Sequence, residues 1–119
     1  PPKIDSDLRP ALREATLVLV PVASSHVDLW ATDGVLDLAT RVGRPALLVL
    51  NRAKAGTRLV AEVAEAAALL DAELATARLG QRMAYAETLG QGMSVADGPA
   101  TPARGEVEAL AAEIARRLA

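Results

Sequence analysis

Asn51 is the residue of this sequence whose type and position best suit ligand binding. It directly follows residues 46–50, ALLVL, a short apolar run that predicts a buried strand. Ligands of open α/β sheets bind at the carboxyl ends of strands. An amide both donates and accepts hydrogen bonds, so Asn51 can pair with an edge that offers both, such as that of adenine. The alternative is an ordinary turn residue, since Asn is common after strands.

Two further stretches are candidates for the same neighbourhood. Arg52 is expected near a bound base or at a surface between subunits, with a solvated loop arginine as the alternative. Leu79, Gly80 and Gln81 end the next predicted strand, so their backbone can pack against a base or a ribose. For these three residues, the alternative is a plain turn at Gly80.

No residue is assigned a catalytic or metal-ligating role. His26 is the only histidine and the sequence has no cysteine, so neither a metal site nor a disulfide is supported. Asp28 is expected to stabilise the start of a helix through the helix dipole. The remaining candidate carboxylates are interpreted as solvated helix charges, namely Glu62, Glu65 and Glu87.

The composition predicts a single domain that spans residues 1–119. Half of the residues are apolar, and Trp30 and Tyr85 are the only aromatic ones, which disfavours nucleic-acid binding by base stacking. The net charge is −2, so any contact with DNA requires a local basic patch. No apolar run approaches the roughly 20 residues of a membrane span, and no signal peptide is visible. These features predict a soluble cytoplasmic protein.

Apolar patterning predicts strands that alternate with helices, and hence an α/β fold. The runs at 17–22 and 46–50 lack alternation, which predicts that both faces of each strand are covered. The weaker strand candidates are 74–79 and a short edge strand at 93–95. Helices are expected at 8–15, 27–42, 57–70, 81–89 and 104–118. We therefore expect a parallel sheet with helices on both faces and further strands alongside.

Four segments, in this order, resemble the ParA family of partition ATPases. Residues 1–22, PPKIDSDLRPALREATLVLVPV, resemble the stretch after the family's Walker B aspartate, and residues 24–32, SSHVDLWAT, resemble the following loop and helix start. Residues 45–59, PALLVLNRAKAGTRL, resemble the strand that ends in Asn-Arg. Residues 78–95, RLGQRMAYAETLGQGMSV, resemble the segment that closes the nucleotide site. The resemblance implies the C-terminal half of a P-loop NTPase-like fold.

The resemblance also implies site roles and partners. It implies that Asn51 binds adenine and that Arg52 and residues 79–81 lie nearby. It also implies ATP and Mg²⁺ as cofactors. Family members dimerise with ATP and bind DNA without sequence preference through surface arginines, for which the candidates here are Arg58, Arg78 and Arg82. A ParB-like or small centromere-binding protein would stimulate hydrolysis, and the protein would be associated with the nucleoid. Scattered surface charge is the alternative for each arginine.

The family's phosphate-binding loop, K-G-G-x-G-K-T, would lie upstream of Pro1, and its Walker B aspartate two residues before Pro1. The start at Pro1 suggests a processed or truncated chain. Because those groups hold the phosphates and Mg²⁺, we expect no ATP hydrolysis by these 119 residues alone.

Three alternatives remain beside plasmid or chromosome partition. One is a ParA-like protein that positions another cargo, and one is a non-catalytic interaction module. A MinD-like membrane ATPase is disfavoured, because residues 104–119 carry three Glu and three Arg and no aromatic anchor.

Overall fold

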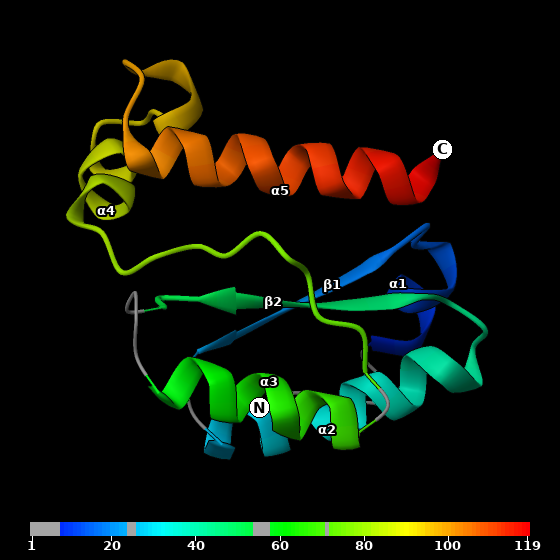
Figure 1. Cartoon of the computed structure of the whole chain (residues 1–119). Coiled ribbons are helices and arrows are strands. Elements are labelled where there is room, and N and C mark those ends of the chain that lie inside the picture. Colours follow the sequence, from blue (N-terminus) through cyan, green and yellow to red (C-terminus); the bar gives the residue numbers. More distant parts are fainter. Residues whose placement is uncertain (1–7, 24–25, 54–57, 71) are drawn as a thin grey trace.

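The computed structural model describes residues 8–23, 26–53, 58–70 and 72–119, which form an α/β fold (Figure 1). Some residues whose types predict helix N-caps lie outside these ranges, namely Asp5, Ser6, Asp7, Ser24, Ser25 and Thr57. The elements are α1 (Arg9–Glu14), β1 (Val18–Ala23), α2 (His26–Arg41), β2 (Ala46–Asn51), α3 (Arg58–Leu69), α4 (Met83–Gly90), the 3₁₀ turn η2 (Val95–Asp97) and α5 (Pro102–Leu118).

The sheet of the described chain has two parallel strands, β1 and β2, paired from Val18 with Ala46 to Ala23 with Asn51. The helix α2 connects them, as a parallel pair requires. It ends at a turn where Gly43 adopts a left-handed φ of 74°, which a residue without a Cβ reaches without strain. Pro45 then leads into β2.

Helices cover both faces of β2, as its unbroken apolar run predicts. On one face lie α2 and α3, with Leu38 and Val63 packed in the core cluster that holds Leu48 and Leu50. On the other face, α5 contributes Leu110, which packs against a smaller cluster made of Leu47, Val49 and Ala75. Figure 1 shows α2 and α3 below the sheet and α5 above it.

For β1, the expectation of two covered faces is wrong. Its residues alternate between buried and exposed, with Val20 buried and Leu19 42% exposed. One face of β1 is covered, because Val18, Val20 and Val22 belong to the core cluster on the side of α2 and α3. The other face is not, because the cluster on the side of α5 contains no residue of β1.

Residues 74–79 do not form the predicted strand. Leu74 makes an isolated parallel bridge with Leu48, and Gly80 makes one with Ala53. Between these two bridges the segment advances six residues, from 74 to 80, while the neighbouring chain advances five, from 48 to 53. The segment therefore contains one extra residue, as a β-bulge does. We refer to residues 73–81 as the bulged segment.

Glu113 of α5 binds the backbone of the bulged segment between its two bridges to β2 and the residues that follow it. Its Oε2 accepts a hydrogen bond from the Thr76 N–H and its Oε1 one from the Ala77 N–H, each at 2.9 Å. Glu113 is only 8% exposed, so the carboxylate replaces ladder partners that these two N–H groups would otherwise lack. One helical turn further on, Arg117 pairs with Glu73 at the start of the segment.

The predicted edge strand at 93–95 is also wrong. Ser94 Oγ accepts from the Ala96 N–H and Asp97 Oδ2 accepts from the Ser94 N–H, so local side-chain bonds form the turn η2 instead. The last helix begins at Pro102, two residues before the expected start, because Thr101 Oγ1 accepts from the Arg104 N–H and proline suits the first turn. The helix expected at 81–89 begins at Met83.

We predict that Glu113→Gln lowers the free energy of unfolding by roughly 1–3 kcal/mol, because an amide can satisfy only one of the two N–H groups. The hydrogen bond from the Ala77 N–H lowers the pKa of Glu113 below 4.5 against the opposing effect of burial, and the Thr76 N–H adds to this. A carboxyl whose pKa is lower in the folded state stabilises the fold fully above its unfolded pKa, and this contribution is lost as pH falls. As the pH falls, the variant should therefore lose less of its free energy of unfolding than the wild-type protein does.

The measurement is urea unfolding followed by circular dichroism at neutral pH and below pH 4.5. Glu108→Gln is the matched control, since the Glu108 side chain is 59% exposed and pairs with Arg104 on the same helix. A change within about 0.5 kcal/mol is expected there. Equal effects of the two substitutions would contradict the role of Glu113.

Candidate functional site

A cavity of about 450 Å³ lies at the carboxyl end of β2, and we call it the Asn51 cavity. Its volume is within the range of small-molecule sites. Five of the residues that line it are site candidates from the sequence, taken from two stretches about 30 positions apart. The lining residues are Asn51, Arg52, Gly80, Gln81, Arg82, Tyr85, Ala86 and Leu89.

The convergence follows from the path of the chain. Asn51 is the last residue of β2, and beyond it the Ala53 N–H donates to the Leu79 carbonyl at 3.0 Å. The Gln81 N–H in turn donates to the Ala53 carbonyl at 3.1 Å. These bonds hold the end of the bulged segment beside the end of the strand, so both stretches reach the same edge. Leu79 itself does not line the cavity, because it packs against the cluster beneath α5.

Asn51 also makes a local contact that fixes its orientation. Its Oδ1 accepts a hydrogen bond from the Arg52 N–H at 3.1 Å. Arg52 has a φ of 54°, in the left-handed region that non-glycine residues seldom adopt. Because Oδ1 takes the N–H of the next residue, the Nδ2 group remains as the donor of the half-buried Asn51 side chain.

Glu106 of α5 joins three groups at the rim of the Asn51 cavity. Its Oε1 accepts from the Gly80 N–H at 3.2 Å, from Arg82 Nε at 3.0 Å and from the Tyr85 hydroxyl at 2.9 Å. Its Oε2 accepts from Arg82 Nη2 at 3.3 Å. A Cβ on Gly80 would lie 2.9 Å from Glu106 Oε2, so the absence of a side chain at position 80 lets the carboxylate approach.

The charges in this cluster stabilise one another. Burial raises the pKa of Glu106, but hydrogen bonds from Arg82, the Gly80 N–H and Tyr85 outweigh it, so the pKa is lowered overall. The hydrogen bond to Glu106 raises the pKa of Arg82. The cluster therefore holds an ionised carboxylate against a guanidinium at the cavity rim.

The three arginines predicted to bind DNA lie on different elements. Arg58 begins α3, with a side chain 92% exposed and 3.3 Å from the Glu62 carboxylate. Arg78 is exposed on the bulged segment. Arg82 lines the Asn51 cavity and pairs with Glu106, so its described contacts connect it with the cavity. His26 and Asp28 fall within the backbone of α2.

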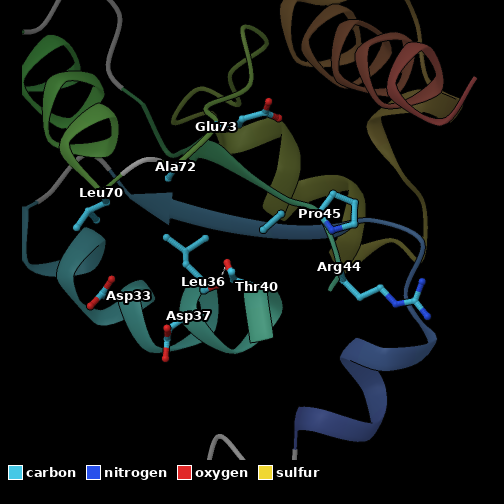
Figure 2. A pocket seen from close by; sticks show the side chains of 10 residues that line it. Asp33, Leu36, Asp37, Thr40, Arg44, Pro45, Leu70, Ala72 and Glu73 are labelled. Atoms are coloured by element: carbon cyan, nitrogen blue, oxygen red, sulfur yellow. Dashed lines mark hydrogen bonds between the residues drawn. The ribbon is translucent and has the colours of Figure 1, made fainter. Parts of the chain in front are cut away.

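A second cavity, of about 420 Å³, lies at the amino end of β2 (Figure 2). Asp33, Asp37 and Glu73 give it a negative lining, and Arg44 is the one basic residue among the described residues that line it. No site residue predicted from the sequence lines it. Its acidic lining disfavours phosphate esters, and its place is opposite the strand ends where ligands of parallel sheets bind.

Sequence reasoning missed Glu106 and Tyr85. In the helix expected at 104–118, Glu106, Leu110 and Glu113 follow helical spacing and share one face. Two acidic residues on the face that carries Leu110 were the available signal. Within the described residues, no group of three or more His, Cys, Asp or Glu side chains is arranged to hold a metal ion.

Neither a scan against models of known protein families nor a search of curated proteins finds a match for this chain. None of the helices in the described ranges is long and apolar enough to cross a membrane. The geometry of the Asn51 cavity is therefore the basis on which a function can be argued.

We predict that Tyr85, the only tyrosine, titrates at about 12 instead of 10.0. Burial of the hydroxyl is the main cause, and its hydrogen bond to Glu106 adds to the shift. Because the folded state holds this proton more tightly, the resulting stability is present below pH 10.0 and is lost as pH rises towards about 12.

Absorbance of the tyrosinate during a pH titration measures this value, with circular dichroism as a check that the protein stays folded. Glu106→Gln should lower the midpoint towards 10.0, because it removes the neighbouring negative charge. A midpoint near 10.0 in the folded wild-type protein would show that the hydroxyl is not held by Glu106.

Proposed function

We propose that the Asn51 cavity is the adenine end of an ATP site, in the downstream half of a ParA-type partition ATPase. The observation that carries this proposal is the convergence of Asn51, Arg52, Gly80 and Gln81 on one cavity at the carboxyl end of a parallel strand. The sequence resemblance separately implies that these residues lie near a bound nucleotide. Open parallel sheets bind nucleotides at this edge.

The lining can recognise a base by shape and by hydrogen bonds. Ala86 and Leu89 of α4 provide apolar contacts, and the half-buried Gly80 also lines the cavity. The Asn51 amide and the exposed Arg52 offer polar contacts from the end of β2. The lining thus combines apolar contacts with polar groups that can fix the orientation of a ligand.

Under this proposal the phosphates and Mg²⁺ are held by upstream residues that carry the phosphate-binding loop. ATP then favours a dimer that binds DNA without sequence preference, and a ParB-like or small centromere-binding partner stimulates hydrolysis and release. The described residues supply the base pocket and part of the outer surface. Positioning of another cargo would use the same cycle.

We predict that adenosine monophosphate binds with an affinity in the millimolar range, since the phosphate-binding groups are not among the described residues. In a nuclear magnetic resonance titration, the amide signals of Arg52, Gly80 and Gln81 should shift. Asn51→Ala should weaken binding about tenfold, as expected for the loss of one well-placed hydrogen bond.

Asp37→Ala is the matched control, because Asp37 lines the cavity at the other end of β2. Its affinity for adenosine monophosphate should equal that of the wild type. Shifts centred on Asp33 and Thr40, or an unchanged affinity of the Asn51 variant, would contradict the proposed base pocket.

We predict that Arg78→Glu weakens binding of double-stranded DNA and reduces the slope of log affinity against log salt by at least about 1, since a phosphate contact is lost. Fluorescence anisotropy with duplexes of unrelated sequence, in the presence of ATP, measures both quantities. Arg44→Glu makes the same charge change at the amino end of β2 and should bind DNA as the wild type does. Equal losses in both variants would indicate a response to net charge alone.

A further inference from the structure

We propose that Glu106 is a positioning residue of the Asn51 cavity, which holds Arg82 so that its remaining N–H groups donate to acceptor atoms of a bound nucleotide. The inference rests on the proposed nucleotide site and extends it, because it assigns a role to a helix that the sequence did not connect with the ligand. Its ligand class is a nucleoside phosphate, whose ring nitrogens and oxygens are acceptors.

The first step is the geometry of the ion pair. Arg82 uses one edge of its guanidinium, Nε and Nη2, against the two oxygens of Glu106 at 3.0 and 3.3 Å. This two-point contact fixes the plane of the group as well as its distance. A guanidinium has five N–H donors, so Nη1 remains for another partner.

The second step is the place of Glu106 relative to the cavity. Its Oε1 accepts three hydrogen bonds, from Gly80, Arg82 and Tyr85, and its Oε2 accepts one from Arg82. These three partners line the Asn51 cavity, whereas Glu106 itself does not. It therefore acts on a ligand through the groups that it holds.

The third step is the polarity of the cavity lining. Asn51 has Oδ1 engaged by the Arg52 N–H and presents Nδ2, while Arg52 and Arg82 are donors only. Glu106 neutralises one of these two positive charges. The lining thus favours a ligand that offers several acceptors.

Glu113 provides a matched control on the same helix. It lies seven residues after Glu106 and likewise accepts backbone N–H bonds from the bulged segment. Its partners Thr76 and Ala77 do not line the Asn51 cavity. A role limited to fastening α5 would make the two glutamates equivalent towards a ligand.

The test is calorimetric titration of adenosine monophosphate into the wild-type protein, Glu106→Gln, Glu113→Gln, Arg82→Ala and the Glu106→Gln/Arg82→Ala double variant. We expect Glu106→Gln and Arg82→Ala each to weaken affinity about tenfold, the loss that follows when a hydrogen bond from a charged group is misplaced. Glu113→Gln should stay within about twofold of the wild type. The double variant should be no weaker than either single variant, because Glu106 acts through Arg82.

Three results would overturn the positioning role. One is an equal loss in Glu106→Gln and Glu113→Gln, and the second is losses that multiply in the double variant. The third is an unchanged affinity of Arg82→Ala. This result tests the positioning role even if circular dichroism shows that Glu106→Gln is unfolded. If the wild type binds adenosine monophosphate and Asn51→Ala weakens that binding, any of these three results contradicts only the role of Glu106. If the wild type does not bind adenosine monophosphate, both the proposed function and the role of Glu106 are contradicted.

Discussion

The satisfaction of backbone N–H groups in the bulged segment is the constraint on which the rest of this structure depends. A segment that leaves a β ladder carries donors that must be paired, because a buried unpaired N–H is costly. Glu113 and Glu106 of α5 meet this need at Thr76, Ala77 and Gly80. Seven residues of helix advance about 10.5 Å, and three to four extended residues advance about 10–13 Å, so the two carboxylates match the spacing of their partners.

The same interactions link stability to the site. Burial of a carboxylate is unfavourable unless hydrogen bonds replace its water, and both glutamates have such bonds. At Glu113 these bonds only fasten the helix to the sheet. At Glu106 they also hold Arg82 and Tyr85, which line the Asn51 cavity. One face of α5 therefore stabilises the packing of the domain at one end and holds two lining residues of the Asn51 cavity at the other.

The sequence predicted those features that depend on local periodicity. The apolar run before Asn51 predicted β2, and helical spacing predicted α2, α3 and α5 to within one or two residues of most ends. The strand expected at 74–79 failed because its register slips by one residue against β2, and no pattern in a weak apolar run signals such a slip. Glu106 was missed because its partners lie 21 to 26 positions away, beyond any local signal. The ParA-type assignment and the site roles that it implies stay predictions.

Asn51 shows why alternatives posed from sequence need not exclude each other. A turn residue and a ligand-binding residue appeared to compete for this position. In the structure the Oδ1 atom supports the turn by accepting the Arg52 N–H, and this leaves the Nδ2 atom as a donor in a side chain that lines the cavity. The turn fixes the amide in one orientation before any ligand arrives, and it holds Arg52 in a left-handed conformation. Pre-organisation of this kind lowers the entropy lost on binding, so the local role of Asn51 favours the ligand role that we propose for it.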